Sequence, residues 1–203
     1  YHASTVLFPT LAELKRAHAQ RYNTTYYGRY GTPTHFAFED AVCVLEGGHR
    51  AITTSSGLAA IHIALISQLA VGDHLLVTDN VYAPTRLLCD GLLTNMGITT
   101  TYFDPLDTQA LGDKITGKTK VIFLESPGSL TFEVCDVPTI SNMAKAKGIT
   151  TILDNTWATP LFFKGLAHGV DIVLHAATKY IVGHADAMLG VLVCHEGSWR
   201  KVK

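Results

Sequence analysis

The sequence carries almost no net charge. Its 16 lysines and arginines are balanced by 17 aspartates and glutamates, and only 16% of its 203 residues are charged. Without a basic surplus, the chain has no electrostatic footprint for nucleic acid or for an anionic membrane surface. We therefore expect its partner to be a small molecule or another protein, with no nucleic acid and no membrane involved.

Cysteine is scarce and dispersed. The four cysteines form no CxxC pair: Cys43, Cys89, Cys135 and Cys194. This spacing argues against a zinc knuckle and against a secreted disulfide framework. We predict buried free thiols in a reducing compartment, the cytoplasm. His175, His184 and His195 also lack the close spacing of metal ligands, so no metal site is predicted.

No apolar run is long enough to cross a bilayer. The most apolar stretch, LAAIHIALISQLAVG at residues 58–72, is short and is interrupted by histidine, serine and glutamine. The patterns GxGxxG and GxxxxGK[ST] are missing too, which argues against dinucleotide and nucleoside triphosphate sites. The chain opens at Tyr1 rather than at a methionine and closes on GSWRKVK. We expect both ends to be cut, so that a targeting peptide would not be visible.

From residue 50 onward, short β-rich apolar runs alternate with helical patterns. HLLVT, VIFLE, TTILD and DIVLH are bounded by turn residues and separated by stretches of helical periodicity. This alternation is typical of βα units around a sheet. The predicted fold class is α/β, with a mostly parallel sheet and flanking helices.

The first 49 residues differ in kind from the rest. They contain a helical pattern around LAELKRAHAQ, a polar aromatic loop RYNTTYYGRYGTPTH, and a helix FAFEDAVCVLEG that ends at Gly47 and Gly48. No strand pattern occurs among them. We predict an N-terminal arm with helices over residues 1–49 and one α/β domain over residues 50–203.

A lysine and a carboxylate follow two of the predicted strands. Asp154 ends the run TTILD, and Lys179 follows DIVLHA. An amine can bind an aldehyde covalently, and a carboxylate can keep a pyridine nitrogen protonated so that the ring accepts electrons. Alone, each residue has an ordinary explanation, a helix cap for Asp154 and a surface turn for Lys179. Together they indicate a site for pyridoxal 5′-phosphate.

Other candidate residues fall at the same edge of the predicted sheet. Ligands of open α/β sheets bind outside the carboxyl ends of the strands. Thr178 precedes the lysine, Tyr82 follows the run HLLVT, and the turn that contains Gly57 and Leu58 follows RAITT. Free N–H groups at this turn would favour a phosphate, although Ser-Gly before a helix is more often simple capping. Tyr82 could stack on a flat ring, or it could be a half-buried loop aromatic.

The loop YYGRYG offers Tyr27 and Arg29 two residues apart. An extended backbone would point both side chains the same way and present donors to an oxyanion. A mobile surface loop with a solvated charge fits the same residues.

In their order along the chain, these motifs resemble the cysteine and methionine metabolism family of fold type I pyridoxal-phosphate enzymes. The resemblance rests on YGRYGTPT, SSGLAA, DNVYAPT, LDNTWATP and ATKYIVGHAD. The string LESPGSLT is similar to the cystathionine β-lyase branch, because Gly-Ser follows ESP where γ-lyases and γ-synthases carry Asn-Pro. The implied activity is a carbon–sulfur lyase that converts cystathionine to homocysteine, pyruvate and ammonia.

The resemblance also implies roles for individual residues. Lys179 would bind the cofactor and move protons, with Tyr82 as its second catalytic residue, stacked on the ring. Asp154 would pair with the ring nitrogen, and the phosphate would be held by Gly57, Leu58 and Thr178. Tyr27 and Arg29 would reach the phosphate of a neighbouring subunit, in a homotetramer built as a dimer of dimers.

Two departures from the family pattern limit this reading. Ala176 stands where many relatives have serine, which removes one hydroxyl contact to the phosphate. Family members are about twice as long, and their C-terminal small domain, which grips the substrate carboxylate, has no counterpart here. Two alternatives remain open: a γ-lyase or γ-synthase of the same family, and a non-catalytic cofactor-binding fragment.

Overall fold

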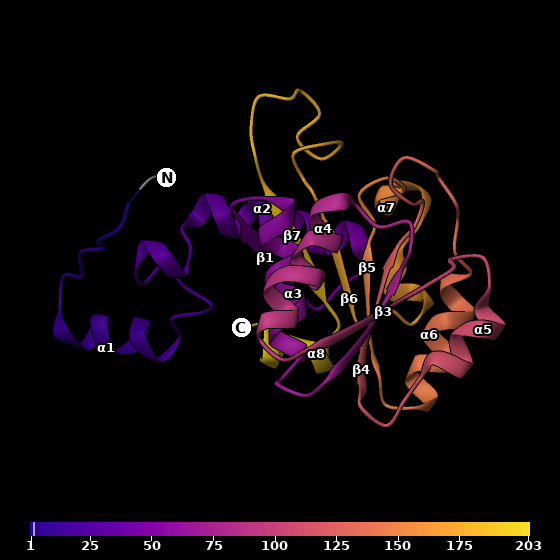
Figure 1. Ribbon diagram of the computed structural model, residues 1–203. Helices are drawn as coiled ribbons and strands as arrows, with labels where there is room; N and C mark the ends of the chain where they lie inside the picture. Colours follow the sequence, from indigo (N-terminus) through magenta and orange to yellow (C-terminus); the bar gives the residue numbers. More distant parts are fainter. Residues whose placement is uncertain (2) are drawn as a thin grey trace.

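The described part of the chain, residue 1 and residues 3–203 of a computed structural model, forms one seven-stranded sheet with helices on both faces (Figure 1). The strands are β1 (Arg50–Thr54), β2 (His74–Thr78), β3 (Thr99–Phe103), β4 (Thr119–Glu125), β5 (Thr150–Asp154), β6 (Ile172–His175) and β7 (Gly190–Cys194). The α-helices are α1 (Leu11–Ala19), α2 (Pro33–Glu46), α3 (Gly57–Gln68), α4 (Ala83–Leu88), α5 (Thr108–Lys114), α6 (Val137–Ala146), α7 (Thr159–Phe162) and α8 (Glu196–Val202). Three short helical turns complete the list: η1 (Gly28–Tyr30), η2 (Cys89–Leu93) and η3 (Gly165–His168).

The sheet is mostly parallel, as the alternating pattern predicts. Its strand order is β1-β7-β6-β5-β4-β2-β3, and β7 is antiparallel to both of its neighbours. Because two antiparallel pairings restore the direction, β1 runs parallel to β6 and therefore to the remaining strands. The carboxyl ends of six strands thus share one edge of the sheet.

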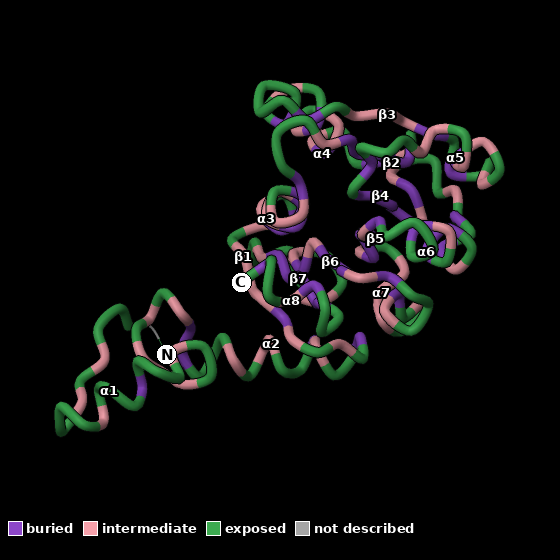
Figure 2. Tube along the Cα trace, turned by 90° about the horizontal axis from the view of Figure 1, so that it is seen from below, coloured by how far each residue is buried: buried purple, intermediate pink, exposed green. Residues whose placement is uncertain are grey.

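Alternation along the strands decides which side chains meet which helices. On β4 and β5, Val121, Phe123 and Ile152 pack in the core under α3, and their neighbours Ile122 and Leu153 pack in the core under α6. Both faces are covered, so the strands read as continuous apolar runs rather than alternating ones. Figure 2 shows the buried residues concentrated in these strands.

The N-terminal segment divides into two parts. The chain around α1 and η1 extends away from the sheet, and Ala17 is the buried residue of α1 (Figure 1). Helix α2 instead packs its Val42 on the sheet beside Ala51 of β1 and Val193 of β7. It is thus part of the α/β body as well as the end of the predicted arm, and the role of residues 1–49 in another subunit stays a prediction.

The expectation of buried free thiols agrees with the structure for three of the four cysteines. Cys89, Cys135 and Cys194 are buried free thiols, and Cys43 is free and partly buried. Within the described residues, no helix combines the length and the apolar character that crossing a membrane requires.

Candidate functional site

The predicted residues of the α/β domain come together at the carboxyl edge of the sheet. Asp154 is the last residue of β5, Tyr82 lies in the loop after β2, Gly57 begins α3 after β1, and Thr178 and Lys179 follow β6. By strand alternation, Asp154 points to the same face as Ile152, which is the face covered by α3. The side chain of Asp154 and the start of α3 therefore lie on one side of the sheet.

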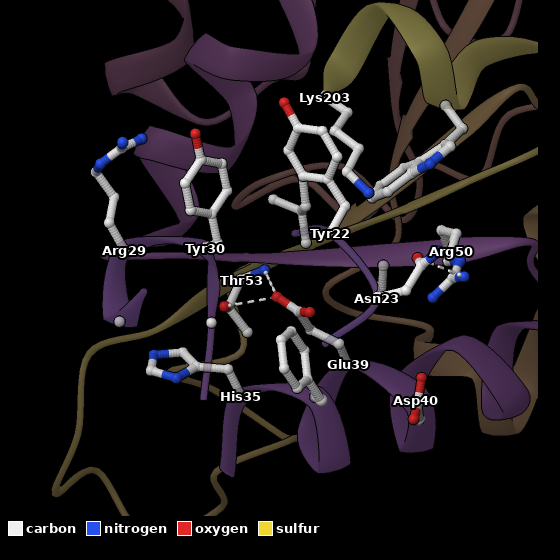
Figure 3. Close-up of a pocket in the computed structure, with 16 residues that line it drawn as sticks. Tyr22, Asn23, Arg29, Tyr30, His35, Glu39, Asp40, Arg50, Thr53 and Lys203 are labelled. Atoms are coloured by element: carbon white, nitrogen blue, oxygen red, sulfur yellow. Dashed lines mark hydrogen bonds between the residues drawn. The ribbon is translucent and has the colours of Figure 1, made fainter. Parts of the chain in front are cut away.

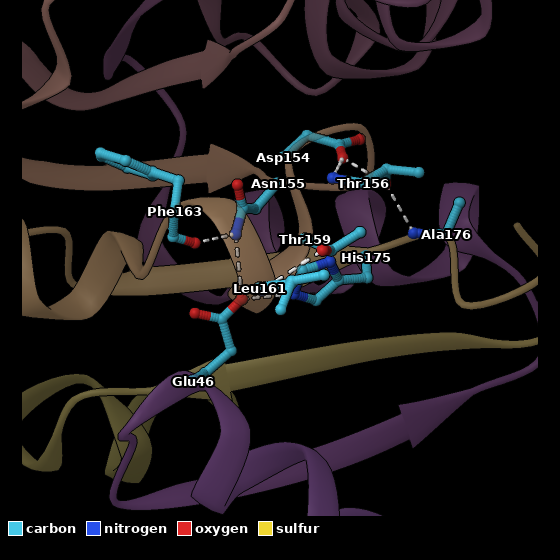
Figure 4. Close-up of polar contacts among 9 residues, drawn as sticks. All are labelled: Glu46, Asp154, Asn155, Thr156, Thr159, Leu161, Phe163, His175 and Ala176. Atoms are coloured by element: carbon cyan, nitrogen blue, oxygen red, sulfur yellow. Dashed lines mark hydrogen bonds and ion pairs between the residues drawn. The ribbon is translucent and has the colours of Figure 1, made fainter. Parts of the chain in front are cut away.

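Asp154 is held by the residue two positions further on. Thr156 donates its backbone N–H (3.0 Å) and its hydroxyl to Oδ1 of Asp154, and the same hydroxyl accepts from the backbone N–H of Ala176 at 2.8 Å (Figure 4). No group in the described residues donates to Oδ2 of Asp154, although the residue is only 6% exposed. This oxygen is free to accept a hydrogen bond from a ligand.

Burial raises the pKa of the Asp154 carboxyl, against the two Thr156 hydrogen bonds and the positive charges of His175 and Lys179, which lower it. Burial disfavours the charged form of a carboxyl unless a cation is bound to it. A protonated ring nitrogen at Oδ2 would therefore favour the ionised form of Asp154. The electrostatics of this position suit a cationic partner.

A second carboxyl lies beside the first. Glu125 ends β4 and is the register partner of Asp154 on β5, so both side chains leave the sheet on the same face. Its Oε2 accepts the backbone N–H of Tyr82 at 2.7 Å. Burial and the charge of Asp154 raise the pKa of Glu125 to about 8. With a pKa of about 8, Glu125 is mostly protonated near neutral pH.

The start of α3 offers donors to an anion. Ser56 caps the helix by accepting the N–H of Ala59 at 3.1 Å, and within the described residues neither Gly57 nor Leu58 has an acceptor for its backbone N–H. The helix dipole adds positive potential at this end. A Cβ at Gly57 would lie 2.5 Å from the Cβ of Ala176, so the helix start sits directly against the loop that carries the lysine.

The loop after β6 places Thr178 and Lys179 at the same edge. Figure 1 shows the segment between β6 and β7 projecting beyond the sheet. The Lys179 side chain is exposed in this chain, and its charge reaches Asp154. The Thr178 hydroxyl donates to the carbonyl of Leu189 at 3.1 Å and accepts its N–H at 2.9 Å. Thr178 thus anchors the lysine loop to the start of β7.

Tyr27 and Arg29 are not brought to this edge. The backbone of Tyr27 is extended, as expected, but the extended backbone expected for Arg29 is wrong: Gly28–Tyr30 forms a 3-10 turn, closed by a 2.8 Å bond from the N–H of Tyr30 to the carbonyl of Tyr27. Arg29 instead lies over the Tyr30 ring at 4.6 Å. It lines a 510 Å³ cavity between the N-terminal segment and β1 (Figure 3), together with Glu39 and Arg50.

A fully buried polar cluster, which the sequence patterns did not predict, lies behind the site. Glu46, at the end of α2, accepts from Asn155 at 3.0 Å and lies 2.6 Å from Nε2 of His175 (Figure 4). Asn155 also donates to the carbonyl of Phe163 at 2.8 Å. The cluster ties α2 to the residue after Asp154 and to the residue before Ala176. A carboxylate at the buried end of an amphipathic helix is the signal that could have indicated it.

Within the described residues, no group of three or more histidine, cysteine, aspartate or glutamate side chains is placed to hold a metal ion. His74 hydrogen-bonds Thr119 at 2.8 Å and Thr101 at 2.9 Å. Such contacts are those of a satisfied core histidine.

The chain is similar to known proteins over its whole length. The family model described as Cys/Met metabolism PLP-dependent enzyme matches residues 1–203. A cystathionine β-lyase of Escherichia coli is 40% identical over 99% of this chain and 52% of its own length. The chain spans about half the length of the curated relatives that it matches.

Two solved structures share the fold. A cystathionine γ-lyase of Lactobacillus plantarum, complexed with L-serine, is 35% identical with a TM-score of 0.90, over 100% of this chain and 51% of the other. A Campylobacter jejuni protein assigned provisionally as an O-acetylhomoserine (thiol)-lyase is 30% identical with a TM-score of 0.91, over 100% of this chain and 50% of the other. That protein contains an N′-pyridoxyl-lysine-5′-monophosphate residue.

Proposed function

Since the chain belongs to the Cys/Met metabolism family of pyridoxal-phosphate-dependent enzymes, we propose that it forms the cofactor-holding part of a carbon–sulfur β-lyase. The substrate would be a sulfur amino acid, cystathionine, and the products homocysteine, pyruvate and ammonia. The observation that carries the proposal is the meeting of Asp154, Lys179, Tyr82 and the start of α3 at one edge of the sheet.

The residues at this edge fit pyridoxal 5′-phosphate, the cofactor of this family. Oδ2 of Asp154 would accept the ring N–H, and the free N–H groups of Gly57 and Leu58 would bind the phosphate. Tyr82 would stack on the ring, and the Lys179 amine would hold the cofactor covalently. Thr178 would contribute to the phosphate site by holding the lysine loop in place, because its hydroxyl donates to the carbonyl of Leu189.

The bound cofactor supplies an electron-poor ring that accepts charge from the substrate's α-carbon. The work of the chain is to hold and move protons around it. Asp154 would keep the ring nitrogen protonated, and Nζ of Lys179 would take the proton from the α-carbon of the substrate. A thiolate would then leave from the β-carbon.

The support for β-elimination is the resemblance of the loop after β4 to the β-lyase branch. Gly128 and Ser129, the pair that resembles the β-lyase branch, lie against the loop after β2: the N–H of Ser129 donates to the carbonyl of Asn80 at 2.9 Å. A Cβ at Gly128 would come within 2.0 Å of Nδ2 of Asn80. The glycine is therefore required by contact with the loop that carries Tyr82, and a bulkier residue there would move that loop.

The proposal also includes a role for the N-terminal loop in a homo-oligomer. Tyr27 and Arg29 would complete the phosphate site of a neighbouring subunit in a homo-oligomer, a dimer of dimers, which agrees with their position away from this chain's own edge. Such a shared site would cover the exposed Lys179 and Tyr82. The L. plantarum γ-lyase structure favours one second candidate, γ-elimination by the same cofactor site.

Product analysis separates the two reactions. The protein expressed from its complete gene, incubated with L-cystathionine, is expected to release pyruvate and homocysteine, measured by lactate dehydrogenase coupling and by thiol chromatography. The appearance of α-ketobutyrate and cysteine would identify a γ-lyase instead. Turnover of neither kind, with cofactor bound, would contradict both lyase assignments.

A further inference from the structure

Glu125 stands out as a buried carboxyl that the proposed chemistry leaves unused. It ends the apolar run VIFLE of β4 and is only 6% exposed. The backbone N–H of Glu125 donates a hydrogen bond to the Thr78 hydroxyl at 3.2 Å. This bond fixes the end of β4 to the end of β2. A carboxyl at such a position is costly to bury unless it has a specific partner.

The partner of Glu125 is the backbone of the aromatic residue of the site. The 2.7 Å bond from the Tyr82 N–H to Oε2 of Glu125 spans the two strands and fixes the N-terminus of α4, where Tyr82 is the cap residue. No side-chain cap bond is present at this helix start. The carboxyl of Glu125 therefore fixes the backbone of Tyr82 at the start of α4, and with it the point from which the Tyr82 ring projects.

We propose that Glu125 is a positioning residue of the cofactor site: its carboxyl holds Tyr82 in place by accepting the hydrogen bond of the Tyr82 backbone N–H. This inference rests on the proposed cofactor site but not on which thioether is cleaved. A neutral Glu125 accepts the hydrogen bond without placing a second negative charge against Asp154, so the ring nitrogen would meet one carboxylate and not two.

The groups that face Glu125 come from three elements. Burial has the largest effect on the pKa of Glu125 and raises it, and the charge of Asp154 on β5 raises it further. The hydrogen bond from the Tyr82 N–H, in the loop after β2, lowers the pKa of Glu125 and so opposes both of these effects. From the loop before α6, Cys135 approaches the Glu125 carbonyl at 3.9 Å through Sγ, and burial keeps its thiol neutral, with its pKa raised to about 11.

The test compares Glu125→Gln with Glu125→Ala. Glutamine keeps an acceptor for the Tyr82 N–H and cannot ionise, whereas alanine removes the acceptor. The dissociation constant for pyridoxal 5′-phosphate, measured by fluorescence titration of the apoprotein from the complete gene at pH 7, is expected to rise about 10-fold in Glu125→Ala and to stay within about 3-fold of wild type in Glu125→Gln. Glu196→Gln, which makes the same change at an exposed carboxyl in the first turn of α8, is the matched control and should match wild type.

A second readout needs no cofactor. Because the folded state raises the pKa of Glu125 from an ordinary value of 4.5 to about 8, the folded chain binds this proton more tightly than the unfolded chain. Its contribution to stability is full below the ordinary pKa and is lost as the pH rises toward about 8. The melting temperature of the wild-type apoprotein relative to Glu125→Gln should therefore fall between about pH 5 and pH 8 and level off above it.

Two results would overturn the proposal. Equal cofactor affinity in wild type and Glu125→Ala would show that Tyr82 does not depend on this carboxyl. A constant difference in melting temperature between wild type and Glu125→Gln across the same pH range would show that Glu125 is not held neutral. Neither measurement depends on lyase turnover, so a failed lyase assignment would be recognised separately.

Discussion

At the scale of single residues, Thr156 connects the two loops of the site. Its hydroxyl donates to Oδ1 of Asp154 and accepts from the backbone N–H of Ala176, three residues before Lys179. The ends of β5 and β6 are thus joined by one oxygen atom. A hydroxyl that both donates and accepts cannot be replaced by an apolar group of the same shape without leaving a partner unpaired.

Thr156→Val should weaken both the fold and the ionisation of Asp154. Loss of the hydroxyl leaves the Ala176 N–H unpaired, which is expected to cost about 1–3 kcal/mol in urea unfolding. The same hydroxyl lowers the pKa of Asp154, so its removal raises that pKa, and the acidic limb of the kcat/KM profile should move to higher pH. Thr156→Ser keeps the hydroxyl and is the control. An unchanged acidic limb in Thr156→Val would contradict the role assigned to this bond.

The sequence could predict the residues that end strands, and it could not predict their partners. Asp154 and Lys179 follow runs whose length and composition identify buried strands, and the rule that ligands bind at the carboxyl edge then places them together. Glu125 meets Tyr82 across 43 positions of the chain, and His175 meets Glu46 across 129. Such contacts depend on strand order and helix placement, which local periodicity does not specify.

At the scale of elements, the start of α3 and the loop after β6 form a closely packed pair. Gly57 is buried against Ala176, and the space between them admits no side chain. The alanine at 176 thus packs against the helix start. This contact fixes the distance between the free N–H groups of α3 and the lysine loop.

Gly57→Ala should strain this contact. The new Cβ would lie 2.5 Å from the Cβ of Ala176 and 2.8 Å from its Cα. Forcing the two elements apart is expected to cost about 1–3 kcal/mol in urea unfolding and to weaken cofactor binding. Adding Ala176→Gly removes the nearer of the two atoms, so the double variant should recover part of both losses.

Gly112→Ala is the matched control for this variant. Gly112 lies within α5, and a Cβ there meets nothing within 4 Å. This change should stabilise the protein by up to about 1 kcal/mol, because alanine is the better helix former. If Gly57→Ala behaves like Gly112→Ala, the close approach of α3 to the lysine loop does not constrain the site.

At the scale of the whole molecule, the α/β body and the two helices of the N-terminal segment could be predicted, and the surface on which that segment packs could not. Continuous apolar runs separated by helical periods specify a sheet covered on both faces, and the structure has this arrangement. The helical period of α1 gives an apolar stripe but does not identify the surface that receives it. Residues such as Leu7 and Leu11 remain 89% and 66% exposed, which fits a segment that packs on another subunit.

The most direct measurement locates the lysine that binds the cofactor. The holoprotein from the complete gene is reduced with borohydride, digested and analysed by peptide mass spectrometry. We expect a pyridoxyl group on Lys179, in the peptide that follows β6, and no covalently retained cofactor in Lys179→Ala. A pyridoxyl group on a different lysine, or a Lys179→Ala variant that is labelled as fully as wild type, would contradict it.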